Sequence, residues 1–233
     1  IGRGVHDSSA SLIPYLIAIE EQFILVSTGT WCVTMNPFAD GILDDADIEA
    51  DCINYMQTNG TPIKSSRIML GKEHEIQVGK LAKHLVTSNH EELDVAFDYK
   101  LYENIKTEGE SRFLWVELPN ENPKQETTYE FQSFEENYHQ LMYELVKIQI
   151  QSIYSVIDDR QEIQTVCVDG GFSGNEVFLN ILAHELGDVK VYSSTTANGS
   201  ALGAAIQVSD TRNVPAFLKK NFILKQYPDI QNN

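Results

Sequence analysis

The sequence predicts an α/β fold in which helices cover both faces of a mixed β-sheet. Three observations support this prediction: apolar, strand-like segments come first, a long amphipathic segment follows, and strand and helix patterns then alternate towards the C-terminus. Antiparallel strands followed by alternating strands and helices are typical of a mixed sheet, because each crossover helix returns the chain to a parallel strand.

The first strands are expected to be antiparallel. Residues 22–27 are apolar and predict a buried strand, and residues 31–35 predict a second strand after a polar turn at residues 28–30. A third strand is expected over residues 52–57, between an acidic loop and the Asn59-Gly60 turn. Three antiparallel strands therefore precede the first predicted helix.

That helix is expected over residues 73–85. Residues 88–132 mix charged and aromatic residues with prolines and show no sustained period, so no element is predicted there. A long helix should then begin after Ser133, because Ser133 and Glu136 form a capping-box pattern. Apolar residues at spacings of three and four follow, and they predict that this helix is largely buried.

The last third of the chain alternates strands and helices. Residues 165–168 predict a strand, and the helix after it has one apolar face and stops at Gly187, a typical C-terminal cap. Residues 189–192 predict another strand, and the small residues of 199–206 predict a helix that packs closely on a neighbour. This order fits the ribonuclease-H-like fold of the actin and hexokinase type.

The composition predicts a globular protein and argues against two kinds of partner. Of the 233 residues, 42% are hydrophobic, which is enough for one large or two small domains. The 34 acidic and 17 basic residues give a formal charge of −17, so neither nucleic acid nor an anionic membrane is expected to bind. Because no signal peptide or membrane-spanning pattern is present, we expect a cytoplasmic protein whose cysteines, Cys32, Cys52 and Cys167, are reduced core residues.

A glycine-rich segment joins the strand at 165–168 to the helix after it. Residues 168–175 read VDGGFSGN. Gly170 and Gly171 would let backbone N–H groups and the positive end of the helix dipole approach a nucleotide without side-chain obstruction. The same pattern also occurs as a plain strand-to-helix turn, so this segment alone does not decide between the two interpretations.

Two further segments favour a nucleotide site. Residues 27–31 read STGTW and offer backbone N–H groups and hydroxyls to phosphate oxygens, although a plain hairpin turn has the same appearance. Residues 4–10 read GVHDSSA and place Asp7 among small residues where a ligand could reach it. The alternative for Asp7 is a helix cap.

Taken together and in this order, the segments resemble the C-terminal half of the FGGY family of carbohydrate kinases. Residues 4–10 look like the catalytic aspartate motif of that family, and residues 27–31 like its phosphate-binding turn. Residues 169–175, with 201–205, look like its adenosine-binding segment. The sequences around Asp7 and in the turn look closer to rhamnulose and fuculose kinases than to glycerol kinases.

The resemblance implies an ATP-dependent kinase that transfers the γ-phosphate to a hydroxyl of a ketose or related sugar. Asp7 would be the general base that accepts the proton of that hydroxyl, and His6 would contact the sugar or brace Asp7. Mg²⁺ is implied because phosphoryl transfer needs the charge between the β- and γ-phosphates to be neutralised. The phosphates, the adenine and the ribose would be bound by Gly29, Thr30, Gly170, Gly171 and Asn175.

The resemblance also implies a second domain, because these kinases are similar to two ribonuclease-H-like domains closed around the substrate. We expect residues 1–20 to form the end of the first domain or a hinge, and residues 21–233 to form the nucleotide-binding domain. The N-terminal sugar-binding domain is expected to be absent from this chain, and the isolated chain is expected to be inactive. The apolar content is also compatible with a homodimer.

Other site chemistries fit the sequence less well. Residues 45–56 lack the glycine and the final glutamate of a calcium loop, and the histidines have no zinc-site spacing. Residues 171–174 are one residue short of a serine-hydrolase motif. No metal-ligating residue is therefore predicted. The alternative from another class is a non-catalytic ATP-binding or scaffold module of the same fold, which would have no need for Asp7.

Overall fold

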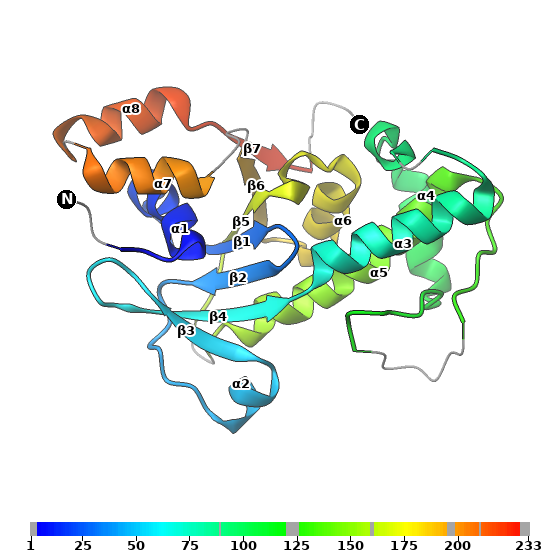
Figure 1. Ribbon diagram of the computed structural model, residues 1–233, viewed down its shortest axis with the longest axis horizontal. Helices are drawn as coiled ribbons and strands as arrows, with labels where there is room; N and C mark the ends of the chain where they lie inside the picture. The colour runs from blue at the N-terminus through cyan, green and yellow to red at the C-terminus, as the bar shows by residue number, and fades with distance from the viewer. Residues whose placement is uncertain are drawn as a thin grey trace.

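The computed structural model describes residues 4–88, 90–119, 126–158, 161–194, 199–209 and 211–228. At its centre lies a seven-stranded sheet with the order β3-β4-β2-β1-β5-β6-β7 (Figure 1). The strands are β1 Ile24–Thr28, β2 Cys32–Asn36, β3 Cys52–Met56, β4 Pro62–Ile68, β5 Thr165–Gly170, β6 Lys190–Ser194 and β7 Leu224–Tyr227. The α-helices are α1 Asp7–Ala18, α2 Asp45–Glu49, α3 Leu70–Leu85, α4 Tyr99–Glu108, α5 Phe134–Ser155, α6 Glu176–Leu186, α7 Gly199–Val208 and α8 Val214–Asn221.

The sheet is mixed, as predicted. β1 pairs with β2 in antiparallel register and with β5 in parallel register, so β1 joins the two halves of the sheet. β5 and β6 are parallel, whereas β7 closes the edge in antiparallel register. The parallel pairing aligns Thr28 with Gly170. The turn after β1, which contains Gly29 and Thr30, and the turn after β5, which begins at Gly170, therefore lie together at the C-terminal ends of the two strands. They are called the β1 turn and the β5 turn below.

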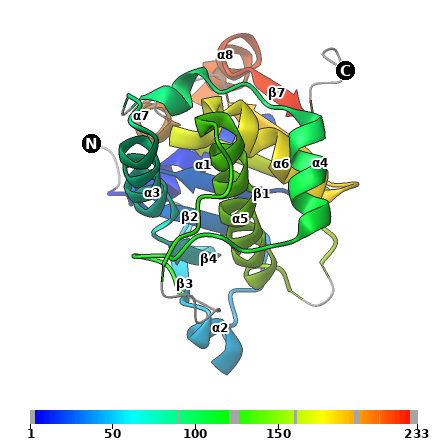
Figure 2. The ribbon, with the colours of Figure 1, turned by 90° about the vertical axis from the view of Figure 1, so that its right-hand side faces the viewer.

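Helices cover both faces of the sheet (Figure 1). Because side chains alternate along a strand, Ile24 and Val26 of β1 point to one core and Leu25 to the other. The first core contains the buried faces of α3, α4, α5 and α6, with α5 lying between α3 and α4 (Figure 2). The second, smaller core contains α1, α7 and α8. The predicted fold class is confirmed.

Local sequence signals explain several of these elements. The capping box of α5 is present, because the Ser133 hydroxyl accepts from the Glu136 N–H at 3.1 Å and the Glu136 carboxylate accepts from the Ser133 N–H at 3.3 Å. Gly187 follows α6 with a positive φ of 65°, as predicted for a helix-terminating glycine. The three cysteines are buried free thiols, as expected.

The prediction of three antiparallel strands is wrong, because a further strand separates the third from the first two. β4 was not predicted, and it lies between β2 and β3, so β3 forms the sheet edge rather than the neighbour of the hairpin. The acidic loop contains the short helix α2, capped by Asp44. The sequence also missed α1, α4, α8 and β7.

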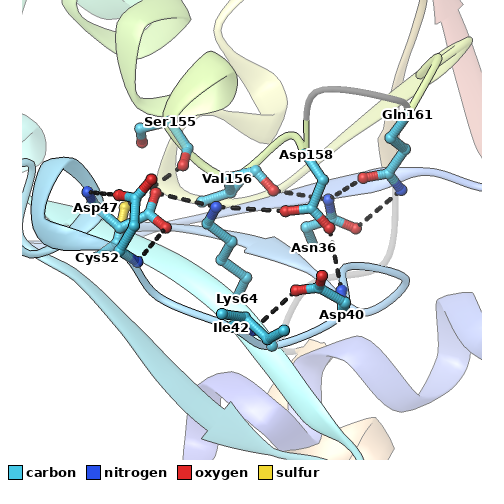
Figure 3. Close-up of polar contacts among 12 residues, drawn as sticks. Asn36, Asp40, Ile42, Asp47, Cys52, Lys64, Ser155, Val156, Asp158 and Gln161 are labelled. Carbon is cyan, nitrogen blue, oxygen red and sulfur yellow. Dashed lines mark hydrogen bonds and ion pairs between the residues drawn. The ribbon is translucent and has the colours of Figure 1, made fainter.

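Lys64 of β4 is buried and paired. The Lys64 ammonium lies between the carboxylates of Asp47 and Asp158, at 2.9 and 3.3 Å (Figure 3). Beside it, the Asn36 side-chain amide donates to the Val156 carbonyl at 2.7 Å. This network ties α2, β2 and β4 to the C-terminal end of α5. Within the described part of the chain, no helix has the length and apolarity needed to cross a membrane.

Candidate functional site

The Thr28 hydroxyl joins the two glycine turns at the edge of the sheet. It donates to the carbonyl oxygen of Asp169 at 2.5 Å and accepts from the N–H of Phe172 at 2.8 Å. Thr28 is itself buried, whereas Gly29 and Thr30 beyond it are exposed. The structure therefore brings the exposed residues Gly29 and Thr30 alongside the β5 turn, although the Gly29 N–H itself donates to the Trp31 carbonyl at 3.0 Å.

Gly170 occupies a position that only glycine can adopt without strain. Its φ is 84° and its ψ is −142°. A Cβ at this position would lie 2.9 Å from the carbonyl carbon of Thr28 and closer still to its oxygen. The β5 turn can therefore approach the β1 turn only because residue 170 has no side chain. Gly171 follows it and begins a short 3₁₀ helix, Gly171–Gly174.

A third segment, the start of α3, meets the β1 turn. The Lys72 N–H donates to the carbonyl of Thr30 at 3.0 Å. A Cβ at Gly71 would lie 2.9 Å from the carbonyl carbon of Gly29, so this contact also requires glycine. Sequence reasoning missed Gly71, although a glycine just after the apolar end of β4 repeats the strand-to-helix pattern seen at Gly170.

Asn175 lies at the centre of a polar and aromatic cluster beside these turns. Its side-chain oxygen caps α6 by accepting from the Phe178 N–H at 2.9 Å, and its amide donates to the Tyr138 hydroxyl at 2.7 Å. His74 Nε2 lies 3.1 Å from the same hydroxyl, and the His74 ring packs edge-on against Phe172 with centroids 5.1 Å apart. His74 and Tyr138 were not identified from the sequence, because each falls in an ordinary helical pattern.

Several titratable groups of this region have shifted pKa values, among them His74 and Asp169. Burial lowers the pKa of His74 to about 4, although the charge of Glu75 opposes the shift, so the imidazole is neutral at pH 7. Burial also raises the pKa of the Asp169 carboxyl above its ordinary value. The Gly170 N–H, which donates to Asp169 at 2.9 Å, partly offsets this increase.

His6 and Asp7 lie at the start of α1 and are exposed, with 54% and 79% of their side-chain surfaces accessible. Asp7 Oδ1 accepts from the Ser8 N–H at 2.8 Å and lies 2.9 Å from His6 Nδ1. The His6 ring stacks on Tyr55 of β3, with centroids 4.7 Å apart. Among the described residues, no hydrogen bond or ion pair connects His6 or Asp7 to the two glycine turns.

A cavity of about 710 Å³ lies beside Lys64 and Asp158, and no residue of the glycine turns lines it. It is a poor site for phosphate, because one lysine faces five carboxylates there: Asp40, Asp44, Asp47, Asp158 and Glu162. Within the described ranges, no group of three or more His, Cys, Asp or Glu side chains is placed to hold a metal ion.

Comparison with known proteins identifies the family that part of the chain resembles. Residues 20–104 match the family model described as the C-terminal domain of the FGGY carbohydrate kinases. The predicted FGGY resemblance is confirmed. The matched segment contains Gly29, Thr30, Gly71 and His74, whereas Asp7 and the β5 turn lie outside it.

Solved carbohydrate kinases share the fold. A carbohydrate kinase from Novosphingobium aromaticivorans aligns over 88% of this chain and 44% of its own, with a TM-score of 0.61 and 21% identity. A xylulose kinase and a gluconate kinase from Lactobacillus acidophilus each align over 94% of this chain and 45% of their own, at 11% identity, with TM-scores of 0.65 and 0.64. The chain thus spans less than half the length of these structures. No protein with curated annotation matches its sequence.

Proposed function

We propose that the chain is the nucleotide-binding half of an ATP-dependent sugar kinase. The observation that carries this proposal is the Thr28 bridge, which holds the β1 turn and the β5 turn at one edge of the sheet. The FGGY match supports it independently, because it covers the β1 turn and the start of α3. Two exposed glycine turns held side by side suit a polyphosphate, which can approach them without side-chain obstruction.

The residues around these turns fit ATP. Gly29 and Thr30 would bind the β- and γ-phosphates, while Gly170 and Gly171 leave room for the nucleotide to approach. Asn175, with the neutral ring of His74 close by, would frame the adenine and the ribose. An uncharged ring and an amide suit a nucleotide base better than charged side chains would. Neither the ring nor the amide has to lose a strongly held hydration shell when the base binds.

Mg²⁺ fits the site only if the bound phosphates supply part of its ligands. It is usually held by one or two carboxylates together with substrate phosphates and water. Asp169, beside both turns, is the carboxylate that would hold it, through water. The metal would neutralise charge between the β- and γ-phosphates, which the overall charge of −17 makes all the more necessary.

Asp7 would act as the general base on the acceptor sugar. Its carboxylate is exposed and bonded only to local groups, so a sugar hydroxyl could reach it and transfer its proton to it as the oxygen attacks the γ-phosphate. His6 lies within 2.9 Å of Asp7 and would orient that carboxylate or contact the sugar. The products would be ADP and a sugar phosphate. A ketose or related sugar remains our prediction for the acceptor.

The part of the site that binds the acceptor sugar, called the acceptor side below, would be completed by an N-terminal domain. In this proposal, residues 1–20 lead from that domain, residues 21–233 bind the nucleotide, and residues 1–233 alone have little activity. The support is the alignment, in which solved kinases are more than twice as long as the matching region. A cytoplasmic location and a homodimer stay predictions.

A non-catalytic ATP-binding module is the second candidate, because long-range hydrogen bonds hold the two glycine turns together, whereas Asp7 contacts only its neighbours. The two candidates differ in whether the carboxylate of Asp7 is needed for activity.

The test that distinguishes the two candidates measures ADP release by the complete gene product with Mg-ATP and a series of ketoses and deoxyketoses. The Asp7→Asn variant is measured in parallel. We expect one sugar to stand out and the variant to lose that activity. ATP binding with no sugar-dependent ADP release would instead support the non-catalytic module.

A further inference from the structure

Helix α7 is the physical link between the β5 turn and the helix that begins at Asp7. Gly199, its first residue, abuts Asp169, since a Cβ there would lie 3.0 Å from the Asp169 carboxyl carbon and closer still to an oxygen. Gly203 abuts α1, since a Cβ there would lie 2.6 Å from the carbonyl carbon of Ala10. The two glycines are four residues apart and so share one face of α7, about 6 Å apart along its axis.

The Ala10 carbonyl that faces Gly203 is unusual within its own helix. In a regular helix it would accept the N–H of residue 14, but Pro14 has no N–H, and a proline ring crowds the carbonyl four residues before it. Such a carbonyl tilts away from the helix axis. Here it is oriented towards α7, at the point where Gly203 leaves space for it.

We propose that Pro14 and Gly203 are positioning residues that together set the distance between Asp7 and the nucleotide site. This inference rests on the kinase function proposed above. Asp7 lies three residues before Ala10, so a displacement of α1 at Ala10 moves Asp7 with it. The surrounding packing is tight, because Leu12, Ile13 and Tyr15 of α1 and Ile206 of α7 belong to one buried cluster. The contact therefore transmits a displacement of α7 to α1 rather than absorbing it.

The first test is Gly203→Ala in the complete gene product. The added methyl group overlaps the Ala10 carbonyl and pushes α1 outwards, so we expect kcat to fall about 10- to 100-fold. The dissociation constant for Mg-ATP should change by a smaller factor than kcat does, because the methyl group meets Ala10 of α1 rather than either glycine turn. The matched control is Gly79→Ala in α3, where a new Cβ meets no atom within 4 Å and kcat should not change. A Gly203→Ala enzyme with wild-type kcat, or one that loses ATP affinity as much as kcat, would overturn the inference.

The second test is the Pro14→Ala/Gly203→Ala double variant. Alanine at position 14 restores the N–H that draws the Ala10 carbonyl back into α1, so the double variant should recover at least a third of the kcat that Gly203→Ala loses. This recovery distinguishes positioning from general damage to the fold, which a second substitution would only increase. If Gly203→Ala does not fold, folding of the double variant supports the proposal, and its failure to fold contradicts it.

The outcome for the wild-type protein separates this inference from the proposed function. If the complete gene product phosphorylates no sugar, the kinase proposal fails. If it is active and Gly203→Ala is equally active, the kinase proposal stands and the positioning role is excluded.

Discussion

Thr28, at the end of β1, exchanges hydrogen bonds with Asp169 and Phe172 across 141 and 144 residues of sequence, whereas Asp7, at the start of α1, bonds only to its neighbours. The first region is buried and fixed by long-range contacts, and the second is exposed. Preorganised backbone groups need no rearrangement when a nucleotide binds. If the proposed function is right, the nucleotide side would therefore be complete within this chain, while the acceptor side would need contacts from a sugar or another domain.

The largest expected effect comes from Asp7→Asn, which alters the exposed region alone. The asparagine oxygen can still accept from the Ser8 N–H, so only the basicity is lost, and we expect kcat to fall about 10²- to 10⁴-fold. Sugar-dependent ADP release by the complete gene product measures this. Asp45→Asn, another exposed first-turn aspartate, is the control. Equal losses in both variants would remove Asp7 from its proposed role.

Gly170→Ala should have the next largest effect, and it acts on the buried region. Alanine at a φ of 84° is strained and overlaps the Thr28 carbonyl, so we expect about 3 kcal/mol or more of stability to be lost, together with ATP binding. Gly174→Ala, in the same turn, meets no atom within 4 Å and should stay within about 1 kcal/mol of wild type. Urea unfolding of both variants measures the difference, and similar values for the two would contradict this account.

The pH dependence of stability tests the burial of His74. Its folded pKa of about 4 lies below the ordinary value of 6.5, so the unfolded chain takes up the proton first. The stability conferred by the neutral imidazole is full above pH 6.5 and falls as the pH drops towards 4, by at most about 3 kcal/mol. His74→Gln should flatten this part of the profile. Parallel profiles for wild type and variant between pH 4 and 6.5 would show that His74 is not desolvated.

Asn175→Ala gives the smallest effect and separates the two roles of this residue. Loss of the α6 cap should cost about 1 kcal/mol, and ATP affinity should fall as well. Asp98→Ala removes an equivalent cap from α4, away from the site, and should cost similar stability without weakening ATP binding. Thermal unfolding and ATP titration of both variants test this. If the two variants bind ATP equally, Asn175 is a structural cap only.

The sequence predicted α5 and β5, whose buried residues are largely apolar, and missed β4, whose buried residues are largely polar. The capping box of α5 and the apolar strand β5 show strong local patterns, and both were found. β4 was missed because Lys64, Ser65 and Ser66 are buried in it. Their burial is made possible by contacts with residues that are distant in sequence, such as the ion pair of Lys64 with Asp158 and the hydrogen bond from Ser152 to Ser66.

Contacts between residues distant in sequence also limited the prediction of the candidate site. Gly29 and Gly170 were identified because each lies in a short motif, and the parallel register of β1 and β5 then brings their turns together. Gly71, His74 and Tyr138 come from helices that look ordinary in sequence, and only the fold brings them to Thr30 and Asn175. The α1 helix was missed because Pro14 interrupts its pattern, although Pro14 is the residue that shapes its contact with α7.

The most direct test of the central claim is a calorimetric titration of residues 1–233 with Mg-ATP, alongside an assay of sugar-dependent ADP release by the same sample. The account predicts one ATP site with a dissociation constant between about 1 μM and 1 mM, the usual range of substrate affinities, and little or no ADP release. A folded chain that binds no ATP would contradict the claim that the nucleotide side is complete within this chain. Full turnover would contradict the claim that the acceptor side is not.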